Sequence, residues 1–462
     1  MLRQMTTNNK VVDISIVVAT NRPVKFLKEI MRSVYRTSTL NLEVIVVNDD
    51  PSRVVTNSDF DSFFSELNMT SSILFDLKII NNEKNSGPGF SRNCGIDVAE
   101  GYYILFIDDD DELDLSVLSI LPDMQQRPDI IFLGFEDTST VFTNYDLQNK
   151  LPASKIFKIT KLQQAFLENV FLPAQIQPYL FNREFLKTNK LKFPNAYVGE
   201  DLAFNTMAML KAKSVFNIPG FFYKYISRPG TLKSSQGIER SIDLLRCLVD
   251  LHNFKNQVSV LSATAQKFCH EIMIFFQSLF CMRVLLASSK TENIISQSSF
   301  SEDSEIKIIK HVFENKIDVS ELRDFINKIA VELKRICTQM LIPLLENFQK
   351  VFVFCVGSLG RSVAKLVTEG CNKEVIFVDE MFDKFPTKKV DGLGLISPKD
   401  LYNFDEKKCV IVCNPQPAIE TKIANEIKKN EQSGANDFNL IFGSQLIKES
   451  ASLFFGKCEV VF

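Results

Sequence analysis

The order of hydrophobic and polar residues along the chain divides it into three regions. From about residue 13 to residue 235, short apolar runs alternate with amphipathic stretches, a pattern typical of a mainly parallel α/β sheet. The runs expected to form strands are Ile14–Ala19, Glu43–Asn48, Phe75–Ile80, Tyr103–Ile107 and Ile130–Phe135. Helices are expected between them, for example at Val24–Tyr35 and Gly89–Glu100. Residues 1–235 are therefore predicted to form an α/β domain.

The strand pattern stops beyond this domain and returns near the end of the chain. Between residues 236 and 349, apolar side chains recur at helical spacing, as at Ile242, Leu245 and Val249, so a helical region is expected. Strands are expected again at Val351–Val356, Glu374–Asp379, Cys409–Cys413 and Asn439–Phe442. Residues 350–462 are therefore predicted to form a second, smaller α/β domain.

Composition and charge argue against two classes of function, nucleic-acid binding and structural zinc binding. The 462 residues include 53 Lys and Arg against 56 Asp and Glu, a net charge of -3, whereas nucleic-acid-binding domains usually carry a strong basic excess. The ten cysteines contain no C-x-x-C pair and there are three histidines, so a structural zinc site is not expected. The first ten residues lack the apolar core of a signal peptide, and a reduced cytoplasmic location is expected.

The most apolar long window covers residues 268–287, and it contains His270, Glu271, Gln277 and Arg283. A membrane-spanning helix requires about 20 nearly uninterrupted apolar residues. We therefore expect a buried amphipathic helix here. Peripheral contact with the inner face of the cell membrane is left open as the alternative.

Polar clusters follow the expected strands, where an open α/β sheet binds its ligand. The first two are Thr20-Asn21-Arg22-Pro23 and Asn48-Asp49-Asp50-Pro51-Ser52. Each taken alone is explained better by a capped turn than by contact with a ligand such as a base or ribose. The third runs from Asn85 to Gly95, where glycines lead into a helix whose first amides favour an anion. Arg92 lies one turn into that helix and can reach a phosphate or a carboxylate.

Two further clusters are acidic. The expected strand Tyr103–Ile107 runs straight into five acids at residues 108–112, which repel one another unless a cation compensates them. Mg²⁺ and Mn²⁺ prefer such carboxylate oxygens, and a solvated acidic turn is the alternative. Glu200 and Asp201 open an expected helix. Acids at this position either stabilise the helix through its dipole, or place one carboxylate toward a cleft where it acts as a general base.

Taken in order, these clusters resemble the family 2 glycosyltransferases, which have the Rossmann-like GT-A fold. The resemblance covers about residues 12–235. The matching stretches are Ile16–Pro23, Val46–Ser52, Gly87–Gly95, Gly101–Asp111, Gly199–Asp201 and Phe222–Thr231. Two departures are that Pro51 replaces the usual Gly of the base-binding turn, and that no histidine near the end of the region can serve as a third metal ligand.

The resemblance implies an inverting transfer of sugar from a nucleotide-diphospho-sugar, with UDP-sugars favoured, to a hydroxyl of a glycan or lipid-linked acceptor. Asp108 and Asp110 match the D-x-D motif: Asp108 would hold ribose or metal, and Asp110 would ligate Mn²⁺ or Mg²⁺. Asp201 matches the catalytic base, with Glu200 in support. The other residues expected around the nucleotide-sugar are Thr20, Asn21, Arg22, Asp49, Asp50, Gly87, Arg92, Asp109 and Arg228. The expected context is bacterial surface polysaccharide, such as capsule or lipopolysaccharide.

The C-terminal domain has a motif of its own. The strand Val351–Val356 leads into Gly357 and Gly360, and Asp379 ends the next strand, so the pattern resembles an incomplete Rossmann fingerprint. A second nucleotide site and a packing or assembly module are both consistent with it.

Three other functions are left open for the whole chain: a bifunctional enzyme, a non-catalytic nucleotide-sugar-binding scaffold and a nucleotidyltransferase. The oligomeric state is left open as well. The scaffold is disfavoured because the three key acids are intact, Asp108, Asp110 and Asp201. The nucleotidyltransferase is disfavoured because the chain lacks the Gly- and Lys/Arg-rich N-terminal loop expected for one.

Overall fold

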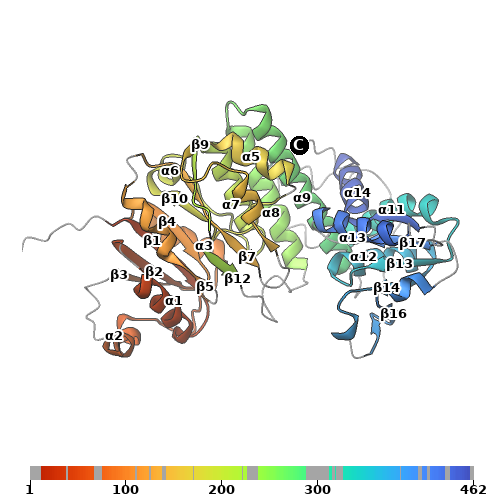
Figure 1. Ribbon diagram of the computed structural model, residues 1–462, viewed down its shortest axis with the longest axis horizontal. Coiled ribbons are helices and arrows are strands. Elements are labelled where there is room, and N and C mark those ends of the chain that lie inside the picture. Colours follow the sequence, from red (N-terminus) through yellow and green to blue (C-terminus); the bar gives the residue numbers. More distant parts are fainter. Residues whose placement is uncertain are drawn as a thin grey trace, which may run out of the picture. The chain divides into compact units, whose positions relative to one another are not determined.

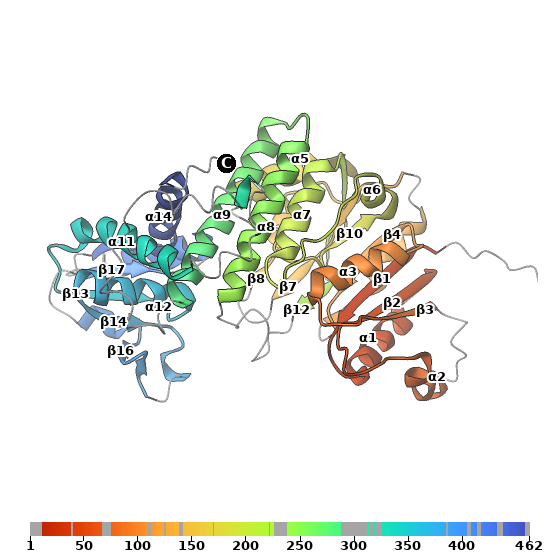
Figure 2. The same cartoon turned by 180° about the vertical axis from the view of Figure 1, so that it is seen from behind.

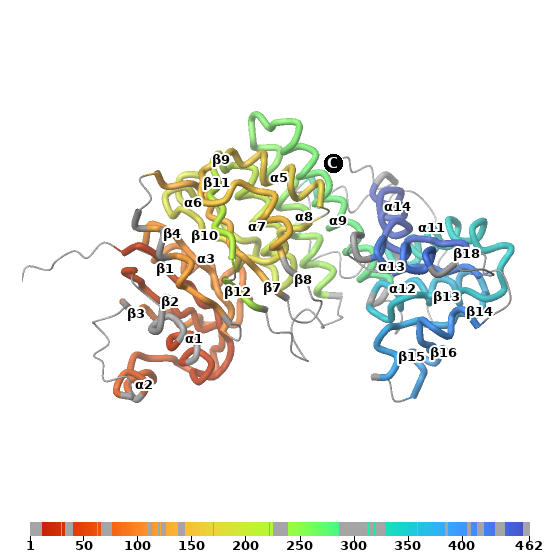
Figure 3. The backbone as a smooth tube through the Cα atoms, in the orientation of Figure 1, coloured from red at the N-terminus to blue at the C-terminus, as the bar shows by residue number. Residues whose placement is uncertain are grey.

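The chain forms two compact units in the computed structural model (Figure 1). The structure describes residues 12–37, 40–66, 75–109, 112–123, 126–137, 142–169, 171–220, 222–225, 238–287, 312–314, 318, 326–384, 387–403, 408–413, 417–431 and 438–457. The N-terminal unit consists of Met1–Ser234 with Phe254–Cys269, and the C-terminal unit of Ser235–Asn253 with His270–Phe462. The tube in Figure 3 follows the chain through both units.

An eight-stranded mixed sheet forms the centre of the N-terminal unit. Its strands are β1 (Ile14–Thr20), β2 (Leu42–Asn48), β3 (Phe75–Asn81), β4 (Tyr103–Ile107), β6 (Ile130–Phe132), β9 (Ile156–Lys158), β10 (Tyr179–Asn182) and β11 (Ser214–Asn217). Their order is β3-β2-β1-β4-β10-β6-β11-β9. The first four are parallel, whereas β10 runs antiparallel to both β4 and β6. The carboxyl ends of β1, β2 and β4 therefore meet at one edge.

The expected strand Ile130–Phe135 is wrong as a single element. It splits at Gly134 into β6 and β7 (Phe135–Asp137), and β7 joins a small sheet of order β5-β12-β7-β8 with β5 (Glu112–Leu113), β12 (Tyr223–Tyr225) and β8 (Phe142–Thr143). A Cβ at Gly134 would lie 1.7 Å from the carbonyl oxygen of Gly220. The backbone of Gly220 therefore comes so close that only glycine fits at residue 134.

Helices cover both faces of the large sheet. They are α1 (Val24–Thr37), α2 (Asp61–Glu66), α3 (Gly87–Val98), α4 (Tyr145–Asn149), α5 (Ile159–Glu168), α6 (Arg183–Thr188) and α7 (Glu200–Lys211). Leu27 and Ile30 of α1 share a buried cluster with Ile16 of β1, while Gly95 of α3 lies against Val17 of the same strand. Adjacent residues of a strand point to opposite faces, so α1 and α3 cover opposite sides of the sheet (Figure 2).

The C-terminal unit contains a six-stranded sheet of order β15-β16-β14-β13-β17-β18. The strands are β13 (Lys350–Phe354), β14 (Glu374–Val378), β15 (Lys389–Val390), β16 (Leu393–Ile396), β17 (Lys408–Val412) and β18 (Phe438–Phe442), and the helices are α11 (Ile326–Leu345), α12 (Ser358–Lys365), α13 (Pro417–Glu431) and α14 (Gly443–Lys457). All neighbouring strands except β15 and β16 are parallel. Numbered by their order in the chain, the five main strands lie in the sheet as 3-2-1-4-5, the order of the Rossmann fold. This confirms the expectation of a Rossmann-like C-terminal domain.

The long helices α8 (Ile238–Gln257) and α9 (Ala263–Ala287) follow the N-terminal sheets in sequence and precede α11. Among the described residues, Ala263–Leu285 of α9 is the one stretch long and apolar enough to cross a membrane, and 61% of its apolar window is buried inside the protein. Phe268, Phe276 and Phe280 are among its fully buried side chains. Core helices of soluble proteins have this same composition.

Candidate active site

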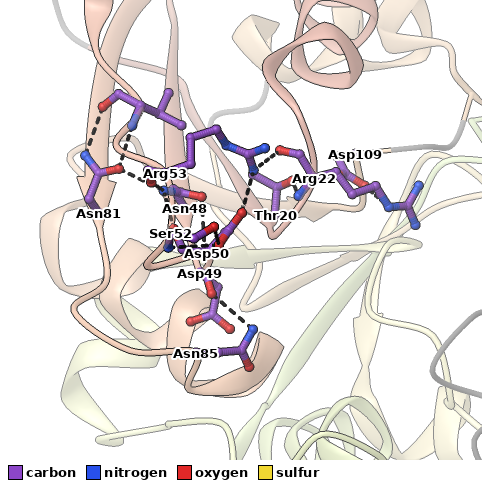
Figure 4. A network of polar contacts seen from close by, with 11 residues as sticks. Thr20, Arg22, Asn48, Asp49, Asp50, Ser52, Arg53, Asn81, Asn85 and Asp109 are labelled. Atoms are coloured by element: carbon purple, nitrogen blue, oxygen red, sulfur yellow. Dashed lines mark hydrogen bonds and ion pairs between the residues drawn. The ribbon is translucent and has the colours of Figure 1, made fainter.

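The candidate site lies at the edge where β1, β2 and β4 end, and its rim is drawn in Figure 4. Asp109, directly after β4, is 6% exposed. Its carboxylate accepts a hydrogen bond from the Thr20 hydroxyl and forms an ion pair with Nε of Arg22 at 3.5 Å. These contacts tie the end of β4 to the end of β1. Asn21 lies beside them in the exposed turn after β1.

The two acids that follow β2 differ in exposure. Asp49 is 5% exposed, and its carboxylate accepts backbone N–H bonds from Ser86 (2.9 Å) and Gly87 (2.8 Å) and a side-chain bond from Asn82 (2.7 Å). Asp49 therefore fixes the start of α3. The side chain of Asp50 is 25% exposed. Of the two acids, Asp50 is the one with a surface open to a ligand.

Asp50 is held by a short turn. Its carboxylate accepts hydrogen bonds from the backbone N–H (3.0 Å) and the hydroxyl (2.6 Å) of Ser52, and it forms an ion pair with Nη2 of Arg53 at 3.4 Å. The bonds from Ser52, with a smaller effect from Arg53, lower the pKa of Asp50. Arg53 also donates to the carbonyl oxygen of Arg22, so it links the turns after β1 and β2. We did not predict Arg53 from the sequence.

Arg92 is the centre of a second group of acids. It projects from α3 and is 3% exposed. Nη1 donates to Asp201 at 2.7 Å and to Glu200 at 3.0 Å, and Nη2 donates to Asp108 at 3.1 Å. Its guanidinium carbon also lies 5.5 Å from the centroid of the Phe193 ring. One arginine thus joins the end of β4 to the start of α7.

Burial and charge act in opposite directions on this group. Burial alone would lower the pKa of Arg92, but the charges of Asp201, Asp108 and Glu200 outweigh it and raise that pKa. For Glu200, burial raises the pKa, and the Arg92 guanidinium opposes that shift without cancelling it. The side chains of Asp201 and Asp108 are 18% and 33% exposed, against 8% for Glu200. Asp201 and Asp108 are therefore the acids of this group that a ligand can reach.

Gln177 belongs to the same site, although we did not predict it from the sequence. Its Nε2 donates to the second oxygen of Asp108 at 2.7 Å, and it is 3% exposed. Gln177 comes shortly before β10, and β10 pairs antiparallel with β4, with Leu180 opposite Leu105. The start of β10 therefore lies at the same edge as the end of β4. No apolar alternation had marked this short strand.

Glycines bring the start of α7 close to the start of α3. Gly199, directly before α7, has φ +88°, and Gly87 has φ +85° with the Tyr197 ring against it. A Cβ on Gly89 would lie 2.5 Å from the carbonyl oxygen of Pro194. The Tyr197 hydroxyl donates to Oδ1 of Asn85 at 2.8 Å. The segment before the Glu200–Asp201 pair thus lies directly on the glycine-rich turn.

Two predicted residues, Asp110 and Arg228, lie outside the described residues. The part of the chain that the structure describes contains no group of three or more His, Cys, Asp or Glu side chains arranged to hold a metal ion. The structure does bring together Thr20, Arg22 and Asp109 in one group and Arg92, Asp108, Glu200 and Asp201 in another.

The predicted second site lies at the carboxyl edge of the C-terminal sheet. A Cβ on Gly360 would lie 1.9 Å from the carbonyl oxygen of Cys355, so α12 packs directly on the turn after β13. Asp379 is 8% exposed and accepts backbone N–H bonds from Val356 (3.0 Å) and Met381 (2.8 Å). Space is open above Gly357. Asp379 therefore fixes this turn, and ribose binding by it stays a prediction.

A mixed α/β sheet with acids at the carboxyl ends of β2 and β4 is the arrangement of a GT-A domain. Residues 15–186 match the family model described as Glycosyl transferase family 2, and this part of the chain is a domain of that family.

The relatives include the uncharacterized glycosyltransferase EpsJ of Bacillus subtilis, 26% identical over 226 residues, which are 47% of this chain and 62% of EpsJ. Another is the poly(ribitol-phosphate) beta-N-acetylglucosaminyltransferase TarS of Staphylococcus aureus, 25% identical over 46% of this chain and 35% of TarS. The chain thus spans less than two thirds of either relative. The crystal structure of S. aureus TarS 1–349 with UDP-GlcNAc aligns with a TM-score of 0.45 and 17% identity, over 70% of this chain and 92% of that chain.

Proposed function

We propose that the protein is an inverting glycosyltransferase, which moves a sugar from a nucleotide-diphospho-sugar to a hydroxyl of a glycan or lipid-linked acceptor. The observation that carries the proposal is that Asp108 and Asp201, two partly exposed acids from separate elements, share one buried arginine, Arg92. The family 2 domain over residues 15–186 supports it. A UDP-sugar is the favoured donor because of the resemblance described above.

On the donor side, Asp50 would accept a hydrogen bond from the base, because it is the exposed acid after β2. Arg22 and Asn21 would line the same rim. Thr20, Asp49 and Asp109 would act beneath them, since all three are buried and their polar atoms bond within the protein. We therefore assign these three to holding the strand ends rather than to direct contact with the nucleotide.

A divalent cation fits the donor chemistry of the site. The carboxylate of Asp108 is one third exposed, and the bonds from Arg92 and Gln177 use two of its about four lone-pair positions. Asp108 and Asp110 would hold Mn²⁺ or Mg²⁺, which favour such oxygens. When bound, the cation would neutralise the diphosphate as it leaves.

Asp201 is proposed as the general base. Its side chain is 18% exposed at the first turn of α7, next to the buried Glu200. Removal of the acceptor proton there lets the hydroxyl attack the anomeric carbon opposite the leaving diphosphate, which inverts the configuration. A positioned base of this kind contributes about 10²–10⁴-fold in rate. Glu200 would support it through their shared partner Arg92.

The acceptor is proposed to be a bacterial surface polymer or its lipid-linked precursor, with the reaction in the cytoplasm or at the inner face of the membrane. The name of the relative TarS, which transfers a sugar to poly(ribitol-phosphate), supports an acceptor of this class.

The test is release of nucleoside diphosphate by the full chain from a panel of nucleotide-sugars, with Mn²⁺ and then with EDTA. We expect one donor to be turned over, EDTA to stop the reaction, and Asp201→Asn to slow it about 10²–10⁴-fold. Asp61→Asn is the control, because Asp61 is an exposed acid in the first turn of another helix, α2. Full activity of Asp201→Asn contradicts its role. Binding of donor without turnover favours a scaffold, and release of inorganic diphosphate from a nucleoside triphosphate favours a nucleotidyltransferase.

A further inference from the structure

Two buried side chains hold the reactive acids of the site in place. We propose that Arg92 and Gln177 are positioning residues, which fix the Asp108 carboxylate relative to Asp201 and do not themselves contact the donor. This inference rests on the proposed function, and it replaces the expectation from the sequence that Arg92 binds the nucleotide-sugar.

The geometry of Arg92 supports a positioning role. Its two terminal nitrogens point to different elements, Nη1 to Asp201 and Glu200 at the start of α7 and Nη2 to Asp108 at the end of β4. With 3% of its surface exposed, the guanidinium presents almost no area to a phosphate. A guanidinium holds two partners in a fixed planar arrangement, which the single ammonium of lysine does not.

Gln177 completes the arrangement from the other side of Asp108. Arg92 bonds Oδ1 of Asp108 and Gln177 bonds Oδ2, so both oxygens are held and the plane of the carboxylate is set. The segment before Gln177 is in turn bonded to α7, because Nδ2 of Asn205 donates to the carbonyl oxygens of Pro173 (2.8 Å) and Gln175 (2.7 Å). The helix that carries Asp201 therefore also holds the segment that carries Gln177.

These contacts hold Asp108 and Asp201 at a fixed separation. Asp108 is on the donor side and Asp201 on the acceptor side, and the transfer needs both at a constant separation. A misplacement of about 1 Å can cost on the order of 10²-fold in rate. Loss of Arg92 or Gln177 should therefore lower kcat while the donor still binds.

The experiment uses the full chain with Arg92→Lys and Gln177→Met, measuring kcat and KM for the donor and, by calorimetry, the Kd of UDP with Mn²⁺. We expect kcat to fall about 10- to 100-fold in each variant, and the Kd of UDP to rise by a smaller factor, because Asp108 is also proposed to hold the cation. Gln163→Met is the matched control: Gln163 is 1% exposed and its Nε2 donates to the Met209 carbonyl, a buried amide bond of the same kind outside the site. The control should keep kcat unchanged.

Two results would overturn the proposal. If Kd rises tenfold or more in Arg92→Lys while kcat at saturating donor is unchanged, Arg92 is a donor contact. If kcat of Gln177→Met equals that of the control, Gln177 positions nothing. Thermal unfolding shows whether Arg92→Lys still folds, and if it does not, Gln177→Met decides alone because it removes only an uncharged donor. A wild-type chain that turns over no nucleotide-sugar overturns the proposed function itself, before any variant is compared.

Discussion

Neighbouring acids at the carboxyl edge of the N-terminal sheet are adjacent in sequence but differ in chemistry. Asp109 is 6% exposed and ion-paired with Arg22, whereas the side chain of Asp108 is 33% exposed. Asp49 and Asp50 divide in the same way. In each pair one acid is buried and bonded within the protein, and the other keeps a surface open to a ligand.

Gly87 is the residue at which backbone and site are most tightly linked. Its φ of +85° disfavours any side chain, and a Cβ there would lie 3.1 Å from the Tyr197 ring. We expect Gly87→Ala to destabilise the protein by about 1–2 kcal/mol from the backbone alone, to displace Tyr197, and to weaken UDP binding. Thermal unfolding and calorimetry measure the two effects.

Gly392 provides the matched control for this prediction. Its φ is +82°, almost that of Gly87, but nothing lies within 4 Å of a Cβ added there. Gly392→Ala should show the backbone cost without any effect on UDP binding. If Gly87→Ala binds UDP as tightly as the wild type, the contact with Tyr197 does not matter for the donor.

The sequence predicted which strand ends lie together, but not which acid at each strand end is buried. Short apolar runs mark the strands, and the structure places Thr20, Asp50 and Asp108, which lie at or just after the ends of three of them, at one edge of the sheet. Which acid of a pair is buried depends on partners far away in sequence, such as Thr20 for Asp109. Gln177 was missed because it precedes a strand of four residues, too short for alternation to be visible.

At the scale of elements, the opposite edge of the sheet is held by a buried charge. Glu43 of β2 is 0% exposed, accepts hydrogen bonds from the Ser15 hydroxyl and the backbone N–H groups of Glu100 (2.6 Å) and Gly101 (3.1 Å), and pairs with Nζ of Lys78 at 2.8 Å. Burial would raise the pKa of Glu43, but the bonds from Lys78, Ser15 and the Glu100 backbone outweigh it and lower that pKa.

This lowered pKa makes stability depend on pH. The folded pKa lies below the unfolded value of 4.5, so the ionised form favours folding above pH 4.5, and this contribution disappears as the pH falls through the folded pKa. Glu43→Gln should lower the free energy of unfolding by about 1–3 kcal/mol at pH 7, with a smaller difference at pH 3. Urea unfolding at both pH values measures it. Glu100→Gln is the control, since Glu100 also pairs with Lys78 but is 67% exposed.

Asp250 of helix α8 makes the stability of the protein depend on pH with the opposite sign. Burial raises the pKa of Asp250 to about 6, with Arg246 opposing the shift. Because the folded pKa exceeds the unfolded value of 3.8, the charged form disfavours folding above pH 6, and this penalty is lost as the pH falls toward 3.8. Asp250→Asn should therefore raise stability at pH 7.5 by about 1–2 kcal/mol, allowing for the water that reaches the side chain. Equal unfolding midpoints for variant and wild type at pH 7.5 would contradict this.

At the scale of the whole molecule, the division into two units passes through α9. Phe268 belongs to the N-terminal unit, where its ring stacks on Phe166 with centroids 6.0 Å apart. Phe280, on the same helix, belongs to the C-terminal unit and contacts the Phe455 ring at 6.1 Å. Both side chains are buried: Phe268 is 1% exposed and Phe280 is 0% exposed. The division therefore assigns two similar side chains of one helix to different cores.

This assignment predicts separate effects of two similar mutations. Phe268→Ala and Phe280→Ala should each cost about 3–5 kcal/mol, because each leaves a cavity in a packed core. Hydrogen exchange of the full chain should then quicken in α5 and β6 for Phe268→Ala, but in α14 for Phe280→Ala. Each variant is the control for the other. If both variants instead quicken hydrogen exchange equally in both sheets, the chain unfolds as one cooperative unit. The stability of the N-terminal unit then depends on the C-terminal unit as much as on its own core.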